Sequence, residues 1–293
     1  MSSSVPFIHC FQAMTVMCEV QIFANNNAKN IAAMIESNTR RLEDKYNFHS
    51  STSWLNQTVN QRKSSQVPLD EESYTVFEVV KRLVEGTQGL FDPTIGTIKS
   101  LMKRQPEMVQ KAAYESVKEF MGSQAWHLSE QSLVVKETKT QFDFGGVIKE
   151  FAVDQAITIA QSFGVPSALV NFGGDIRALG SKPDGSAFNI AVRNPKERNE
   201  PLFSVPLANA ALTTSAHYER SFQFADKQSS HILSQHGIHP KVLSVSVLAP
   251  TALEAGALST ALTINPQLTL PQEVGVVFID DHLSIHQDTE FVA

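Results

Sequence analysis

The sequence predicts an α+β fold with largely antiparallel sheets and packed helices. Helical patterns are prominent in the first half of the 293-residue chain, whereas short strands separated by turn residues outnumber helices in the second half. Hydrophobic residues make up 42% of the chain, which is enough to bury a large core. The length suits one large domain or two packed lobes, and we expect residues 1–293 to form a single unit.

The first half begins with a strand and two helices. Apolar and polar residues alternate from Met14 to Ile22, as in a strand with one solvated face. From Ala28 to Tyr46, apolar residues recur on one helical face. The segment 47–70 is rich in Ser, Asn and Gln and predicts a long surface connection. Asp70 is the expected N-cap of a second helix, which Gly86 is expected to end.

The rest of the chain changes from a weak helical pattern to strands. Residues 98–120 are polar and weakly helical, and the stretches AWHLSEQSLVV and TKTQFDF look like paired strands around a turn. An apolar helix is expected around 252–262. The expected later strands lie in SALVNFGGDIRALG, FNIAVRNP, FSVPLANAALTTS, SFQF, LSVSVLAP and VGVVFID.

Charge and composition exclude some partners. The 24 Lys and Arg residues against 30 Asp and Glu give a net charge of −6, without a basic run that could follow a nucleic-acid backbone. No segment approaches the roughly 18 apolar residues of a membrane span. The N-terminus lacks the basic and apolar regions of a signal peptide, and Cys10 and Cys18 are expected to stay reduced. We therefore expect a cytoplasmic protein.

The stretch FDFGGVIKEFAVDQA, residues 142–156, combines an acid, a glycine pair and a lysine at the start of a helix. Asp143 is a candidate cap, Gly145 and Gly146 permit close backbone approach, and the free amides together with Lys149 would attract a phosphate. The alternative is an ordinary capped helix with a solvated lysine. Neither the dinucleotide fingerprint nor the Walker lysine pattern is present.

Six motifs occur together in one order along the chain: GLFDPTIG at 89–96, FDFGGVIKEFAVD at 142–154, ALVNFGGDIRALG at 168–180, ALTTSAHYERSF at 211–222, SHIL at 230–233 and SVLAPTALEAGALSTAL at 246–262. This set resembles the motifs of the FAD:protein FMN transferases, and the resemblance covers nearly the whole chain. The resemblance implies a T-fold-like domain of two intertwined lobes. It also implies that FAD binds beside Mg²⁺ and that FMN passes to a Thr or Ser hydroxyl of a flavoprotein, with release of AMP.

The resemblance also assigns roles. His231 would accept the proton of the attacking hydroxyl, and Lys149 would offset phosphate charge. The backbone carbonyl of Ile148 and the hydroxyl of Thr260 would face the metal. The cofactor would be bound by Met14, Asp92, Thr94, Asp143, Gly145, Gly146, Lys149, Asn171, Gly173, Gly174, Asp175, Ser215 and Tyr218.

The chain departs from the family at the metal. The family has an aspartate four residues before Thr260, on the same helical face, but this sequence has Gly256 there. Mg²⁺ prefers anionic oxygens, so the metal would bind poorly. Glu254 would replace the aspartate only if the helix began later than expected. Glu150 stands where the family usually has glycine.

Further departures lie in the fourth and fifth motifs. The family sequence S-G-D-Y reads Ser215, Ala216, His217 and Tyr218, and H-I-L-D-P-x-T-G reads HILSQHGIHP. His231, His236 and His239 fall within nine residues, but their spacing matches no standard zinc pattern, and a polar loop is favoured.

Three functions therefore remain open. The first is an FMN transferase with weakened catalysis or altered metal dependence. The second is a non-catalytic FAD or nucleotide-binding protein, and the third is a hydrolase that splits FAD into FMN and AMP. The residue at position 256 separates the first from the second.

Overall fold

A computed structural model of the chain describes residues 5–24, 26–197, 200–216, 221–223, 228–230 and 242–287. The helices are α1 (Ala28–Tyr46), α2 (Glu71–Gly86), α3 (Gly96–Arg104), α4 (Gln110–Val117), α5 (Ile148–Ser162) and α6 (Ala252–Ile264), with shorter helical turns at Leu55–Asn60, Lys118–Phe120 and Ser123–Ala125. The strands are β1 (Phe7–Ala13), β2 (Val16–Ile22), β3 (Gln66–Pro68), β4 (Trp126–Ser129), β5 (Ser132–Val135), β6 (Ala168–Phe172), β7 (Asp175–Leu179), β8 (Phe188–Arg193), β9 (Pro201–Leu207), β10 (Ala211–Ala216), β11 (Ser221–Gln223), β12 (Gln228–Ser230), β13 (Val242–Ala249), β14 (Gly275–Asp280) and β15 (Ile285–Gln287).

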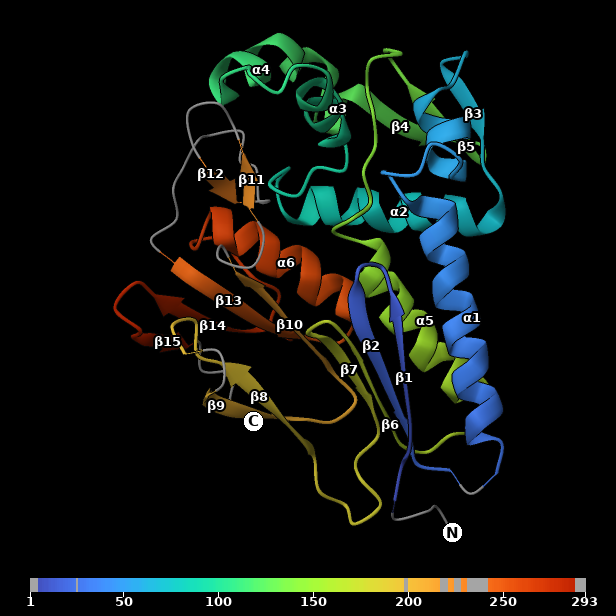
Figure 1. The fold of residues 1–293 in the computed structure, drawn as a ribbon, viewed down its shortest axis with the longest axis vertical. Helices are drawn as coiled ribbons and strands as arrows, with labels where there is room; N and C mark the ends of the chain where they lie inside the picture. Colours follow the sequence, from blue (N-terminus) through green and yellow to red (C-terminus); the bar gives the residue numbers. More distant parts are fainter. Residues whose placement is uncertain are drawn as a thin grey trace.

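The predicted α+β class with antiparallel sheets is confirmed. An eight-stranded sheet in the order β1-β2-β6-β7-β10-β13-β14-β15 forms the lower part of the molecule, and every neighbouring pair in it is antiparallel (Figure 1). Helices α5 and α6 pack against this sheet and against each other, and α1 packs on α5. Helices α2, α3 and α4 and the small sheet β3-β5-β4 form the upper part.

Strand alternation separates two cores on the faces of the large sheet. In β6, Ala168, Val170 and Phe172 join the core that contains α1 and α5. Leu169 joins a second core, which includes residues of the β8–β9 hairpin. Both faces of the sheet are therefore buried, which explains why the strands of this half are apolar almost throughout.

The first predicted strand is in fact the second arm of a hairpin. β1 and β2 pair from Phe7↔Ile22 to Ala13↔Val16, and the turn between them consists of Met14 and Thr15 with φ of 51° and 64°. Such a two-residue turn needs positive φ at both positions, which glycine or asparagine usually supplies. Neither residue is present, so the turn could not be predicted from residue type. Met14 therefore lies at a hairpin tip.

The predicted surface connection 47–70 is wrong in its middle. It contains the buried turn Leu55–Asn60, and the Asn60 side chain accepts a hydrogen bond from the Phe142 amide at 2.7 Å and donates to the Phe142 carbonyl at 2.9 Å. Polar residues can occupy a core when their hydrogen bonds are satisfied there. This segment thus supports the stretch that leads into α5.

The predicted strand in TKTQFDF is also absent, since only an isolated bridge between Ile95 and Gln141 forms there. The AWHLSEQSLVV hairpin is confirmed as β4 and β5. Of the two cysteines, Cys18 is buried and Cys10 is exposed, and both are free thiols.

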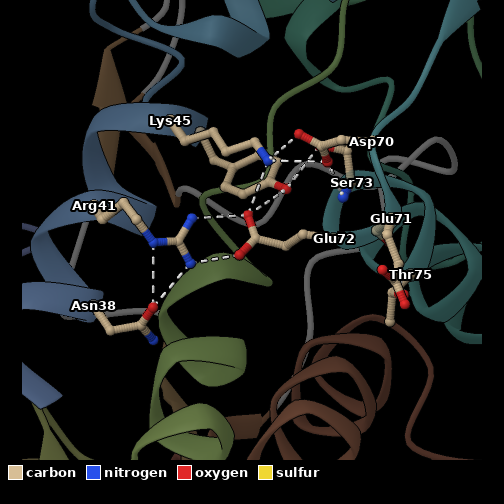
Figure 2. A network of polar contacts seen from close by, with 9 residues as sticks. Asn38, Arg41, Lys45, Asp70, Glu71, Glu72, Ser73 and Thr75 are labelled. Carbon is tan, nitrogen blue, oxygen red and sulfur yellow. Dashed lines mark hydrogen bonds and ion pairs between the residues drawn. The ribbon is translucent and has the colours of Figure 1, made fainter. Parts of the chain in front are cut away.

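A polar network joins the end of α1 to the beginning of α2 (Figure 2). Asp70 caps α2 as predicted, because its side chain accepts a hydrogen bond from the Ser73 amide at 2.7 Å. Lys45 of α1 binds both Asp70 and Glu72, at 2.8 and 2.9 Å, and Arg41 also pairs with Glu72. This network fixes the C-terminal end of α1 against the upper part of the molecule.

Within the described part of the chain, no helix combines the length and apolar character needed to cross a membrane.

Candidate functional site

A cavity of about 800 Å³ lies where the upper and lower parts of the molecule meet. Its walls come from the β1–β2 turn, the end of α1, the segment before α3, the entrance of α5, strand β10 and helix α6. The predicted site residues that line it are Met14, Asp92, Asp143, Gly145, Gly146, Ile148, Lys149, Gly173, Asp175, Ser215 and Thr260. The structure therefore brings most of the predicted site together, although their roles stay predictions.

Three predicted binding residues do not line the cavity. Thr94 is buried, donates to the Asp92 carboxylate at 2.6 Å and accepts from the Gly122 amide at 2.8 Å. Asn171 accepts from the Gly174 amide at 2.9 Å and so shapes the β6–β7 turn. Thr94, Asn171 and Gly174 thus support the walls rather than form them.

Other predicted residues lie outside the described part of the chain. These are Tyr218 and His231, and also the remaining histidines of the possible cluster, His236 and His239. Their predicted roles are untested.

The entrance of α5 differs from the prediction in one respect. Asp143 is not the cap, because α5 begins at Ile148 and its N-cap position is Val147, which has no capping side chain. The Asp143 carboxylate instead accepts from the Gly145 amide at 2.8 Å and pairs with Lys99 of α3 at 2.6 Å. The turn at residues 144–147 separates the acid from the helix, so Asp143 holds the glycine pair in place from the side.

The two glycines of this turn leave room on the cavity side. Gly145 and Gly146 are exposed to solvent and line the cavity. A Cβ atom on Gly146 would lie 3.5 Å from the Phe91 ring, which is an ordinary contact, so the fold tolerates a methyl group there. A Cβ atom on Gly145 would lie 3.1 Å from Oδ1 of Asp143, a tighter contact, so packing favours glycine at 145 but does not require it at 146.

A second glycine turn, between β6 and β7, faces the hairpin tip. Gly173 has φ +62°, and a Cβ atom there would lie 2.7 Å from Val16. Its amide donates to the Met17 carbonyl at 3.1 Å. Only glycine satisfies both the positive φ and the close contact, and this contact brings the two turns together at the cavity.

Lys149 is not available as an isolated cation. Its ammonium group pairs with the Asp175 carboxylate of β7 and lies 3.6 Å from Oε1 of Glu150. The resemblance gave Lys149 to the phosphates and Asp175 to the cofactor, but in the structure the two side chains form an ion pair. The expectation that Lys149 is a free positive charge for phosphate is therefore wrong, because Asp175 compensates that charge.

Glu150 of α5 occupies the space beside Gly256 of α6. A Cβ atom built on Gly256 would lie 2.7 Å from Cγ and 3.3 Å from Oε1 of Glu150. The Glu150 side chain is 9% exposed and lines the cavity, and within the described residues its Oε2 has no hydrogen-bond partner. The site thus has a carboxylate next to position 256, although the sequence predicted its loss.

Glu254 does not take this role. Helix α6 begins at Ala252, the predicted position, with Thr251 as its cap. Glu254 does not line the cavity. Burial first, and the nearby Glu273 and Asp154 carboxylates next, raise the pKa of Glu254.

Hydroxyl groups complete the wall opposite α5. Ser215 of β10 lies 2.8 Å from the hydroxyl of Ser259 and 3.4 Å from that of Thr260. Thr260 is one helical turn beyond Gly256, so its hydroxyl and the space filled by Glu150 belong to the same face of α6. No three His, Cys, Asp or Glu side chains of the described residues converge on a metal position.

Sequence reasoning missed several residues of the walls. Glu43, Tyr46 and Phe48 of the α1 end line the cavity, and so does Phe91. Burial raises the pKa of the Tyr46 hydroxyl to about 12. The sequence pattern predicted a helix face for Glu43 and Tyr46 and a surface connection for Phe48. Only the path of the folded chain brings these residues to the cavity.

Comparisons with known proteins identify the family of the chain. Residues 14–272 match the ApbE family. The chain belongs to the ApbE family. The FAD:protein FMN transferase of Chlamydia pneumoniae is 28% identical over 270 residues, which cover 86% of this chain and 82% of that protein. The one of Treponema pallidum (strain Nichols) is 25% identical over 270 residues, covering 84% and 75%.

Solved ApbE structures share the fold. The ApbE protein of Thermotoga maritima MSB8 has a TM-score of 0.89 with 24% identity, covering 98% of both chains. The flavin transferase ApbE of Vibrio cholerae has a TM-score of 0.82 with 21% identity, covering 99% of both chains. The ApbE family is a family of enzymes, and the cavity lies within the matched residues.

Proposed function

We propose that this chain is an FAD:protein FMN transferase, which moves FMN from FAD to a Thr or Ser hydroxyl of a flavoprotein acceptor and releases AMP. The observation that supports the proposal is the cavity, which is lined by eleven of the site residues that the resemblance implied. Its volume falls near the upper end of the about 300–1,000 Å³ typical of small-molecule sites, which suits a dinucleotide.

The residues suggest how FAD would bind. The exposed backbone at Gly145 and Gly146 would receive the pyrophosphate, because no side chain keeps it away from the first turn of α5. The half-buried Phe48 ring supplies apolar surface in the same cavity, and the Tyr46 and Phe91 side chains are buried in its wall. We assign the ring systems of FAD to such surface and its phosphates to the glycine turn.

The transfer step would follow ordinary phosphoryl chemistry. The acceptor hydroxyl oxygen bonds to the phosphorus of the FMN half, the bond from that phosphorus to the bridging oxygen breaks, and AMP leaves with the bridging oxygen. The hydroxyl proton passes to a base, for which His231 is the candidate. The protein positions both reactants and stabilises the charge that develops.

Magnesium, which the resemblance implies, fits these residues. Oε2 of Glu150, which has no hydrogen-bond partner in the part of the chain that the structure describes, and the hydroxyl of Thr260 are hard oxygen donors. Mg²⁺ is commonly bound through one or two carboxylates together with substrate phosphates. When bound, it would screen the negative charge of the pyrophosphate.

The test is a transfer assay with FAD, Mg²⁺ and a flavoprotein acceptor that carries a flavinylation threonine. We expect the acceptor to gain the mass of one FMN and AMP to appear in equal amount. Gly146→Ala should lower the transfer rate roughly 10- to 100-fold by displacing the pyrophosphate. Gly86→Ala is the control, because no atom lies within 4 Å of its Cβ and it does not line the cavity.

Two results would replace the proposal. AMP release without labelling of the acceptor would indicate FAD hydrolysis. FAD that stays bound in gel filtration, with neither AMP nor labelled acceptor formed, would indicate the non-catalytic binding protein.

A further inference from the structure

We propose that Glu150 of α5 supplies the carboxylate of a divalent-cation site in the cavity, in the space that a side chain at position 256 of α6 would otherwise fill. This deepens the proposed function and rests on it only for the nature of the substrate. The cation site is argued from side chains of this chain alone.

The first argument is the state of the carboxylate. Glu150 is 6% exposed, and its Oε2 has no hydrogen-bond partner within the described residues. A buried carboxylate without a partner is unfavourable, and native structures satisfy such groups with a counter-charge, a proton or a metal ion. Glu150 lines the cavity, so a cation bound there would be held at the cavity wall.

The second argument is the local charge. Two carboxylates, Glu150 and Asp175, share the single ammonium group of Lys149. Lys149 pairs closely with Asp175 and lies farther, 3.6 Å, from Oε1 of Glu150. Among the described residues, this group therefore has two carboxylates and one ammonium group, and Glu150 is the carboxylate without a close counter-charge.

The third argument is the set of neutral oxygens nearby. Thr260 lies one turn of α6 beyond Gly256, and its hydroxyl is 3.4 Å from that of Ser215. Both residues line the cavity together with Glu150 and Ile148. One carboxylate, two hydroxyls and a backbone carbonyl are the oxygen donors that Mg²⁺ and Mn²⁺ accept, and water or phosphate can complete the shell.

Glu150 and Gly256 face each other across the contact between α5 and α6. The Cβ position of Gly256 is 2.7 Å from Cγ of Glu150, so one site cannot hold both a long acid at 150 and any side chain at 256 without a shift. Glycine at 256 is what permits glutamate at 150. The two departures found in the sequence are thus one rearrangement, in which the carboxylate reaches the same space from α5.

The experiment measures Mn²⁺ binding by electron paramagnetic resonance, with the full chain and no FAD. We expect the unmodified chain to bind one Mn²⁺, and Glu150→Gln to weaken the affinity roughly tenfold or more, since even outer-shell partners of a metal are worth 10- to 100-fold. The double variant Glu150→Gly with Gly256→Asp should recover most of the affinity, because the carboxylate returns from α6. Glu254→Gln, which does not line the cavity, should bind as the unmodified chain does.

Equal Mn²⁺ affinity of the unmodified chain and Glu150→Gln, or no Mn²⁺ binding by either, would overturn the inference. A double variant as weak as Glu150→Gln would also overturn it. If Mn²⁺ binding depends on Glu150 but no FMN is transferred, the cation site stands and the proposed function fails. If FMN transfer and Mn²⁺ binding are both unchanged in Glu150→Gln, the proposed function stands and the cation site fails.

Discussion

Asp154 of α5 forms an ion pair with Arg177 of β7, with 2.8 Å between Oδ1 and Nη1. The same carboxylate accepts hydrogen bonds from the backbone amides of Ala252 and Leu253, at 2.9 and 3.1 Å. One side chain therefore connects α5, the sheet and the first turn of α6. Because residues of α5 and α6 both line the cavity, this connection holds two of its walls in place relative to each other.

Replacing Asp154 by alanine should lower the free energy of unfolding by about 3 kcal/mol, because Arg177 and the two amides lose their acceptor in a largely buried place. Asp154→Asn keeps one acceptor oxygen and should cost less. Urea unfolding measures both. Glu85→Ala is the control, since the Glu85 side chain is 63% exposed and its distance to Lys81, 3.9 Å, makes a weak surface pair. Equal losses of stability in Glu85→Ala and Asp154→Ala would contradict the connecting role of Asp154.

The state of Lys149 predicts an unusual effect of its partner. In Asp175→Asn, the ammonium group loses its close counter-charge and becomes available to an anion in the cavity. We expect the affinity for ADP, a probe for the pyrophosphate, to rise roughly three- to tenfold, since a contact pair at the protein surface is worth up to about 4 kcal/mol before desolvation. Isothermal titration calorimetry measures it.

Asp184→Asn is the matched control, because Asp184 is an exposed acid that does not line the cavity. An unchanged or weaker ADP affinity in Asp175→Asn would show that Lys149 does not meet the phosphates.

The glycine pair and Lys149 show which features of the site could be predicted from the sequence. Their spacing predicted a ligand-binding helix entrance, and the structure places them at the cavity. The spacing could not show that Asp175, 26 positions further on, neutralises the lysine. Pairing between distant segments depends on strand register and helix packing, which local pattern does not specify.

The same limit explains the errors of detail. Asp143 has the residue type of a cap, but a turn separates it from α5, and Lys99 and the Gly145 amide are its partners. Glu150 and Gly256 each appeared as a loss when considered alone. Only the contact between α5 and α6 shows that the Glu150 side chain lies beside position 256.

The network at the end of α1 predicts a dependence of stability on acid pH. Burial favours a higher pKa for Asp70, but Lys45 and the Ser73 amide outweigh it and bring the pKa of Asp70 to about 2. Arg41 and Lys45 likewise lower the pKa of Glu72 against the effect of burial. A lowered carboxyl pKa stabilises the fold above the unfolded pKa of about 4, and this contribution is lost as the pH falls from about 4 toward 2.

We expect urea unfolding between pH 6 and pH 2 to show this loss, and the double variant Asp70→Asn with Glu72→Gln to have a flatter profile. The contribution should be no more than about 1 kcal/mol for each pair, because the Asp70 side chain is 58% exposed and solvent screens it. A variant with the same pH profile as the unmodified chain would show that these pairs do not contribute.

The contact between Glu150 and Gly256 predicts coupled effects on stability. Gly256→Asp alone should lower the free energy of unfolding by about 1–3 kcal/mol, because its Cβ meets Glu150 and a second carboxylate enters the same space. Adding Glu150→Gly removes both problems, so the double variant should be more stable than the sum of the single changes by about 1–2 kcal/mol. Gly256→Asp combined with Glu85→Gly should instead be additive within about 0.5 kcal/mol, because Glu85 is an exposed residue of α2 that does not line the cavity. Urea unfolding of the five variants completes both cycles, and additivity in the first cycle would mean that the two helices do not meet at these residues in solution.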